Sequence, residues 1–189
     1  MKNKNILDGA LTYLCGPIDN APDDGVGWRQ RIKKGIKDKN IDLSVLDPTE
    51  KFGDLVSESK EEKELHFKLK KEEKYDELTK YMKKIVRHDL RQVDLCDFLI
   101  AKIDINIHAC GSYHEMILAD IQHKPILLVV EGGKQNTPSW LFGILDHNLF
   151  FDTEEQLIDF LDKVNNGEIK LDDKWVLFRK EIKGILNKQ

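Results

Sequence analysis

Five short apolar segments, separated by longer polar stretches, constrain the fold of this chain more than any other feature. The segments are residues 11–15, 42–46, 98–103, 126–130 and 149–151. Runs of this length are typical of strands, and intervening stretches with helical periodicity are typical of crossover helices. Strands connected in this way form a parallel sheet with helices on both faces. We therefore predict an α/β fold, flavodoxin-like or Rossmann-like, with a parallel five-stranded sheet and a charged helical insertion.

Length and composition limit the class of protein. The 189 residues suit one domain with a sizeable core, so we expect a single domain over 1–189. The longest apolar run, 125–130, is far too short for a membrane span, and the first residues lack the apolar part of a secretory signal. A net charge of −4 with mixed signs argues against stable nucleic-acid binding. Three cysteines without a C-x-x-C pair suit a reducing compartment, and we expect a cytoplasmic protein.

The insertion is a Lys/Glu-rich segment over about 55–85, between the second and third predicted strands. Leu65 and Leu69 lie one helical turn apart, which indicates a helix. A second helical stripe continues through Leu78, Met82, Ile85 and Val93. Because its charges alternate in sign, we interpret the segment as a solvent-exposed helical hairpin and not as a binding tail.

A second amphipathic segment lies near the C-terminus, at 173–186. Its apolar residues, Trp175, Phe178, Ile182 and Ile185, share one helical face. We expect this face to belong to the core or to a subunit interface.

Polar residues and glycines gather where the predicted strands end. In an open parallel sheet, ligands bind beyond the carboxyl ends of the strands, near the point where the strand order reverses. Candidate binding residues at or near this edge are Gly16, Pro17, Asp19, Trp28, Arg29, Asp47 and Asp104. Asp97 falls at the opposite end of its strand, and we interpret it as a cap.

The segment 104–115 is the most informative part of the sequence. It leaves a predicted strand, passes Gly111 and Ser112, and enters a helix predicted over 113–122. Gly111 permits close approach of the backbone, and Ser112 can cap the helix with its amide facing a ligand. Glu115 would then lie in the first turn, where the helix dipole favours an ionised carboxylate suited to nucleophilic attack on a sugar. The alternative is an ordinary capping box.

Asp89 is a carboxylate within the apolar stripe of the helix that precedes the third strand. The spacing places it about 12 Å from the helix end, towards the carboxyl edge of the sheet. Partial desolvation there would raise its proton affinity and suit a proton donor. The alternative is a simple ion pair with Arg87 or Arg91.

Other chemical patterns are weaker. His108, Cys110 and His114 are metal-ligand types, but their spacing matches no common zinc pattern, and we predict no metal site. Cys110 as a nucleophile has equally little support. The glycines of the first loop match neither a dinucleotide-binding nor a Walker motif.

Taken together, several motifs resemble the nucleoside 2-deoxyribosyltransferase family. The motifs are Tyr13-Leu-Cys-Gly-Pro17, Asp89 followed by Asp97 and a strand, Gly111-Ser-Tyr-His-Glu115, and Lys124-Pro125 before an apolar strand. The resemblance implies a five-stranded flavodoxin-like fold and no cofactor. It also implies a small-molecule substrate, a deoxynucleoside or deoxynucleotide with a free nucleobase, and a homo-oligomer whose neighbouring subunits complete each pocket.

The resemblance also implies roles for individual residues. Glu115 would form a covalent ester with deoxyribose, Tyr13 would orient it, and Asp89 would contact and protonate the leaving base. Asp146 or Asn148 resembles the stretch that a neighbouring subunit lends to the 5′ end of the sugar.

One departure leaves the reaction open. Transferases of the family often have an aspartate six residues before the nucleophile, where this chain has Ala109. Relatives that hydrolyse deoxynucleoside 5′-monophosphates generally lack that aspartate too. A phosphate could be bound by Ser112, Arg29 and Arg91, whereas the acidic loop with Asp19, Asp23 and Asp24 favours an uncharged nucleoside. A non-catalytic nucleotide-binding module on the same fold is the alternative of another class.

Overall fold

The computed structural model describes residues 5–50 and 60–178. Within them, all strand pairs are parallel, and the five strands lie in the order β2-β1-β3-β4-β5. The strands are β1 (Leu11–Cys15), β2 (Ser44–Leu46), β3 (Phe98–Ile103), β4 (Ile126–Val130) and β5 (Phe150–Phe151). This is the flavodoxin-like order, which confirms the predicted sheet. β2 begins two residues later than predicted because Asp42 and Leu43 make turn hydrogen bonds, with Gly9 and Ile41 respectively.

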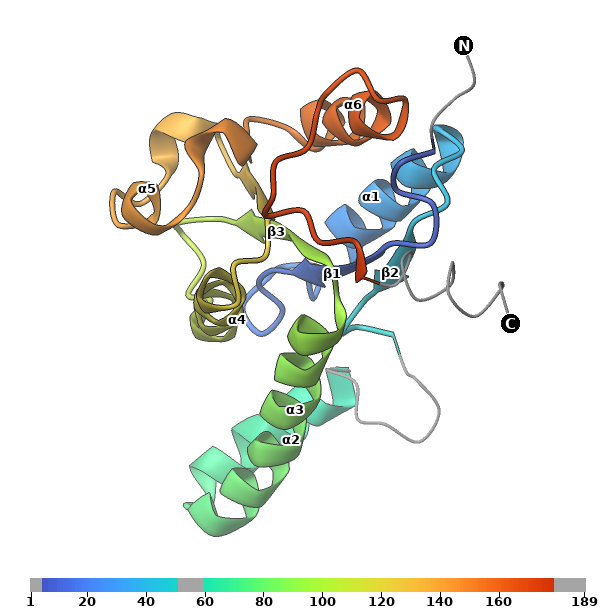
Figure 1. The fold of residues 1–189 in the computed structure, drawn as a ribbon. Helices are drawn as coiled ribbons and strands as arrows, with labels where there is room; N and C mark the ends of the chain where they lie inside the picture. Colours follow the sequence, from blue (N-terminus) through green and yellow to red (C-terminus); the bar gives the residue numbers. More distant parts are fainter. Residues whose placement is uncertain (1–4, 51–59, 179–189) are drawn as a thin grey trace, which may run out of the picture.

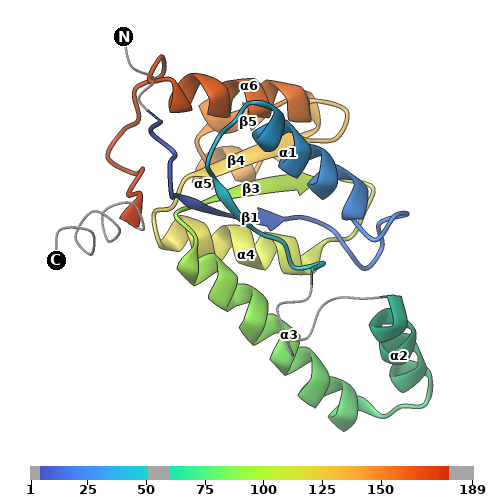
Figure 2. The ribbon, with the colours of Figure 1, turned by 90° about the vertical axis from the view of Figure 1, so that its right-hand side faces the viewer.

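Helices cover both faces of the sheet, as predicted (Figures 1 and 2). They are α1 (Val26–Asp38), α2 (Lys60–Lys71), α3 (Tyr75–Leu95), α4 (Cys110–Ile121), α5 (Leu141–Ile144) and α6 (Glu154–Asn165), with 3₁₀ turns η1 (Lys134–Asn136) and η2 (His147–Leu149). α1 and α6 pack on one face, where Ile32 and Leu161 join the core. α4 and the end of α3 pack on the other, through Met116 and Val93. No described helix has the length and apolar character needed to cross a membrane.

The charged insertion is a helical hairpin in its described part. α2 and α3 pack against each other, and the first half of α3 extends away from the sheet (Figure 2). Leu69 is buried, as a core-facing position requires, but Leu65 is 38% exposed. The predicted insertion continues into α3, which ends only at Leu95, and its residues 55–59 lie outside the described part of the chain.

The first part of the helix predicted over 173–186 is not helical. Residues 173 and 174 form a turn, 175–177 are irregular, and Phe178 is helical. Positions 179–186, including Ile182 and Ile185, lie outside the described residues. Trp175 nevertheless packs on the core, with its ring 5.1 Å from that of Phe98. Leu177 packs against the same core, so apolar contacts hold this segment against the sheet.

Asp97, which the sequence analysis interpreted as a cap, joins two segments that are distant in sequence. Its carboxylate accepts hydrogen bonds from the amides of Leu11, at 2.8 Å, and Phe178, at 3.0 Å. The buried side chain therefore joins the start of β1 to the C-terminal segment.

Candidate active site

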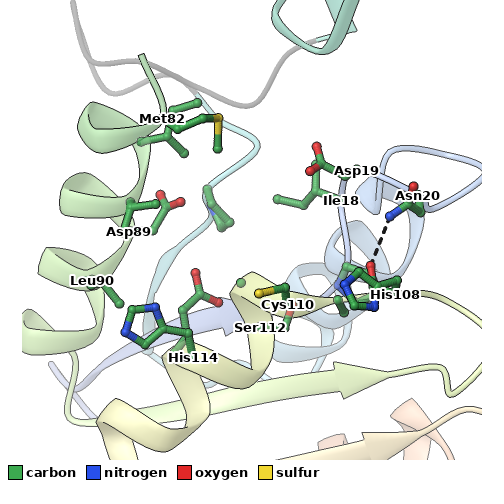
Figure 3. Close-up of a pocket in the computed structure, with 18 of the residues that line it drawn as sticks. Ile18, Asp19, Asn20, Met82, Asp89, Leu90, His108, Cys110, Ser112 and His114 are labelled. Carbon is green, nitrogen blue, oxygen red and sulfur yellow. Dashed lines mark hydrogen bonds between the residues drawn. The ribbon is translucent and has the colours of Figure 1, made fainter. Parts of the chain in front are cut away.

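A cavity of about 310 Å³ lies beyond the carboxyl ends of β1 and β3 (Figure 3). β1 is followed along the sheet by β2 on one side and β3 on the other, so this is the point where the strand order reverses. The predicted site residues that line the cavity are Tyr13, Gly16, Pro17, Asp19, Asp89, Gly111, Ser112 and Glu115. The structure thus brings together all three residues predicted to be catalytic.

Glu115 and Tyr13 form a hydrogen-bonded pair in this cavity. The Tyr13 hydroxyl donates to Glu115 Oε1 at 2.8 Å, and the two residues are 1% and 8% exposed. This bond replaces the capping box that the sequence left as an alternative. Tyr13 comes from β1 and Glu115 from α4, so the sheet itself sets their separation.

α4 begins earlier than predicted. Its first residue is Cys110, and the Tyr113 amide donates to the carbonyl oxygen of Ala109 at 3.2 Å. Ser112 is therefore a buried residue of the first turn and not the cap, and Glu115 lies in the second turn. A Cβ on Gly111 would meet no atom within 4 Å, so the space beside this helix end is open on the cavity side.

Burial raises the pKa of Glu115 and so opposes the effect expected of the helix dipole, which favours the ionised form. Hydrogen bonds from Cys15 and Tyr13 and the charges of Arg29 and His114 oppose this rise without cancelling it. The dipole has little effect here because it acts mainly within the first turn. Burial, followed by the nearby charge of Glu115, raises the pKa of Tyr13 well above its usual value. The phenol therefore remains protonated and continues to donate.

Asp89 projects from α3 into the same cavity (Figure 3). It is 8% exposed, and its Oδ1 lies 3.4 Å from Nδ1 of the adjacent His88. The alternative pairing with Arg91 is not observed, since Arg91 pairs with Asp94 at 3.3 Å. The carboxylate is placed to meet a group bound between α3 and α4.

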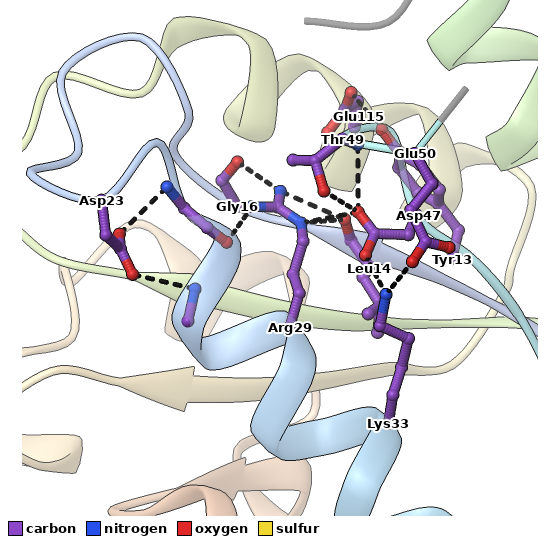
Figure 4. Close-up of polar contacts among 12 residues, drawn as sticks. Tyr13, Leu14, Gly16, Asp23, Arg29, Lys33, Asp47, Thr49, Glu50 and Glu115 are labelled. Carbon is purple, nitrogen blue, oxygen red and sulfur yellow. Dashed lines mark hydrogen bonds and ion pairs between the residues drawn. The ribbon is translucent and has the colours of Figure 1, made fainter. Parts of the chain in front are cut away.

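Arg29 does not line the cavity but stabilises the loop that does (Figure 4). The fully buried guanidinium donates to the carbonyl oxygens of Gly25, at 2.8 Å, Gly16, at 2.9 Å, and Leu14, at 3.4 Å. It also lies 3.6 Å from Asp47. Its five donors thus hold the backbone around the end of β1.

Asp47 is likewise outside the lining of the cavity. Burial raises its pKa, but hydrogen bonds from Lys33, at 2.6 Å, and from Thr49 leave it below the usual value. An ionised Asp47 therefore balances the charges of Arg29 and Lys33, and this role is structural.

The acidic loop after β1 is largely neutralised. Asp23 accepts from the amides of Gly25, at 3.0 Å, and Gly27, at 2.8 Å, at the start of α1. Asp24 pairs with Lys63 of α2 at 2.5 Å. Asp19 alone of the three carboxylates lines the cavity.

The remaining candidates lie elsewhere. Trp28 and Asp104 line a separate depression of about 110 Å³ on the other side of the loop. Trp28 packs on the loop so closely that a Cβ on Gly16 would lie 2.7 Å from its ring. Asp146 caps η2 by accepting from the Asn148 amide at 2.9 Å. The role of these two residues in a neighbouring subunit's pocket stays a prediction.

Sequence reasoning missed several residues of the cavity. His66 reaches it from the insertion, Pro48 from the end of β2, and Asn20 from the first loop. Asn20 donates to the carbonyl oxygen of His108 at 3.1 Å, joining the loops after β1 and β3 (Figure 3). Among them, only the position of His66 could have been predicted, because it lies three residues before Leu69 and therefore on the same, buried side of α2.

His108, Cys110 and His114 all line the cavity. Within residues 5–50 and 60–178, however, no three His, Cys, Asp or Glu side chains are grouped so that they could hold a metal ion. The ionisable side chains that line the cavity are thus carboxylates, imidazoles, a phenol and a thiol.

Comparisons with known proteins show the fold. No family model matches the chain, and no curated protein sequence matches it. A 2-deoxyribosyltransferase from Bacillus psychrosaccharolyticus is similar in structure, with 15% identity, a TM-score of 0.53, and coverage of 79% of this chain and 91% of that one. A conserved protein from Enterococcus faecalis V583 is similar with 13% identity, a TM-score of 0.51, and coverage of 82% and 98%. A CMP N-glycosidase from Clostridium botulinum gives 15% identity, a TM-score of 0.42, and coverage of 80% of this chain and 98% of that one.

These likenesses confirm the expected fold, which this chain shares with a 2-deoxyribosyltransferase. Structural similarity at such low sequence identity does not show an activity, so the residues of the cavity have to indicate the chemistry.

Proposed function

We propose that this chain is a nucleoside 2-deoxyribosyltransferase-like enzyme that cleaves the N-glycosidic bond of 2′-deoxyribonucleosides. The observation that carries the proposal is the buried hydrogen bond of 2.8 Å between Tyr13 and Glu115, inside a cavity that also contains Asp89. The motif resemblance supports the same reaction.

In the proposed mechanism, ionised Glu115 attacks C1′ of the deoxyribose. The C1′–N bond breaks, its electron pair leaves with the base, and Asp89 supplies the proton. A glutamyl ester of deoxyribose results. A second base or water then attacks C1′ from the opposite side and gives its proton to the Asp89 carboxylate, so that the ester bond breaks, Glu115 is regenerated as a carboxylate, and the configuration at C1′ is retained.

The lining of the cavity favours an uncharged nucleoside over a 5′-monophosphate. None of the described residues that line it is Lys or Arg, whereas three are carboxylates: Asp19, Asp89 and Glu115. The two arginines that could have bound a phosphate have other partners, since Arg29 is fully buried among carbonyl groups and Arg91 pairs with Asp94. A phosphate dianion would therefore meet repulsion with no compensating side-chain cation of the described chain.

Mass spectrometry of acid-quenched protein tests the covalent step. After incubation with deoxynucleosides, we expect a deoxyribosyl adduct on the peptide that contains Glu115. Glu115→Ala should give neither adduct nor free base, whereas Glu155→Ala, which removes an exposed carboxylate on α6, should retain both. Cleavage by Glu115→Ala at the wild-type rate would refute the proposal.

A base-exchange assay separates the two fates of the ester. The protein is incubated with one deoxynucleoside and a different free base. Formation of the new deoxynucleoside shows transfer, and release of base alone shows hydrolysis. Binding of the nucleoside without cleavage would support the non-catalytic module instead.

A further inference from the structure

A buried histidine on the insertion contributes to the cavity. Among the described side chains of α2, only His66 and Leu69 are buried. The His66 ring meets Tyr81 of α3 edge-on, with centroids 5.0 Å apart and planes at 70°. His66 also lines the cavity that contains Glu115 and Asp89. Packing on Tyr81 therefore holds an imidazole at the active site from a helix that is otherwise exposed.

A lysine on the same helix attaches the hairpin across the cavity. Lys63 Nζ donates to the carbonyl oxygen of Ile18 at 2.6 Å and to the carboxylate of Asp24. Ile18 belongs to the loop after β1 and lines the cavity itself. Residues three apart share one side of a helix, so this attachment fixes the side of α2 that carries His66. The hairpin is thereby connected to the opposite wall.

The surroundings of His66 suit a flat heteroaromatic ring. Met82, Ile85 and Val86 of α3 provide apolar surface beside it in the cavity. A nucleobase presents apolar faces and a polar edge of N–H and C=O groups. A neutral imidazole offers one donor and one acceptor, which can match such an edge. In the proposed reaction Glu115 approaches C1′ from the side opposite the base, so the base points away from Glu115 towards the remaining walls.

We propose that His66 is a specificity-determining residue that hydrogen-bonds the polar edge of the nucleobase, and that Lys63 is the residue that positions it. This inference rests on the proposed function, which it deepens by assigning the base subsite to the hairpin. The insertion thus acts as a wall of the active site in addition to being a solvated surface element.

Steady-state kinetics of His66 variants test the assignment. Because a base contact is made in both the bound substrate and the transition state, its loss raises KM and leaves kcat nearly unchanged. For His66→Leu we expect KM to rise roughly 2- to 13-fold, the range for one neutral hydrogen bond. Discrimination among purine and pyrimidine deoxynucleosides should weaken. His66→Gln, which retains donor and acceptor, should restore part of both, and Phe67→Leu on the exposed side of α2 should change neither.

A double-mutant cycle tests the role of Lys63. Lys63→Met should raise KM in the wild-type background and have little further effect in His66→Leu, since the lysine acts through the histidine. Additive effects would show that Lys63 acts independently of His66 and would overturn that part of the proposal.

Binding of free bases separates this inference from the proposed function. Adenine, hypoxanthine, cytosine and thymine are titrated into the full chain while the His66 ring resonances are followed by NMR. We expect these resonances to shift, and affinity to fall in His66→Leu, whether or not turnover is measured. Cleavage by the wild type with KM and base preference unchanged in His66→Leu would overturn the inference alone. A parallel fall in kcat without rescue by His66→Gln would show a structural role and overturn it too. Absence of both cleavage and base binding in the wild type would overturn both.

Discussion

Replacing Tyr13 with phenylalanine tests the electrostatics of the proposed nucleophile directly. The change removes the hydroxyl that donates to Glu115 at 2.8 Å and keeps the ring, which is 1% exposed and packed within the sheet. A hydrogen bond to a charged group contributes about 1.5–3 kcal/mol. Since about 1.4 kcal/mol corresponds to a factor of ten, loss of the bond should lower kcat/KM by about 10- to 150-fold at pH values below the pKa of Glu115.

The pH dependence distinguishes this reason from simple damage. The hydroxyl donates to the ionised form of Glu115, so its removal raises a pKa that burial already holds above the usual value. A smaller fraction of Glu115 is then ionised at a given pH, and the acid limb of the rate profile moves to higher pH. The loss of kcat/KM relative to the wild type should therefore be largest at acid pH and should become smaller as the pH rises.

The assay is kcat/KM for deoxynucleoside cleavage, measured by chromatography from acid to alkaline pH for wild type and Tyr13→Phe. Tyr113→Phe is the matched control, because it removes a phenol hydroxyl from α4 at a residue that does not line the cavity. An acid limb that stays in place, or a deficit of equal size at every pH, would refute the argument.

Three further predictions concern charge and stability. Glu115→Gln should abolish cleavage yet raise the melting temperature. Because burial raises the pKa of Glu115 in the folded chain, the wild type loses stability as this carboxyl ionises with rising pH, and the gain of the variant should grow over the same pH range. Differential scanning fluorimetry that shows no pH-dependent gain would contradict this prediction. Asp89→Asn should slow cleavage most for substrates with poor leaving groups, and an equal loss for activated nucleosides would argue against its role as proton donor. Arg29→Met should lower the free energy of unfolding by about 3–5 kcal/mol in urea titrations, since it leaves Asp47 with one cation fewer and removes the Arg29 donor from three backbone carbonyl oxygens. A loss below about 1 kcal/mol would contradict the structural role of Arg29.

The candidate site was partly predictable because its position follows from connectivity. Once residues 11–15 and 98–103 are assigned to parallel strands, the residues that directly follow the two strands must lie at the same edge of the sheet. Glu115 and Asp89 could be placed at that edge by counting residues along the flanking helices. Counting could not place the start of α4, because its first hydrogen bond depends on how the chain turns after β3.

Arg29 shows where residue type misleads. An arginine near the end of a strand is a reasonable phosphate ligand from sequence, but its guanidinium is fully buried among backbone carbonyl groups and Asp47. The partners of a long cationic side chain depend on contacts between segments that are distant in sequence. The local sequence pattern does not indicate these contacts.

By itself the sequence determined the order of the strands along the chain, the parallel sheet and the carboxylates placed near its active edge, because each depends on local periodicity and chain connectivity. Only the tertiary structure decided that Tyr13 donates to Glu115, that burial raises the pKa of that carboxyl, and that His66 reaches the same cavity from the insertion. These depend on desolvation and on distances between segments up to about a hundred residues apart, and both exist only once the chain is packed.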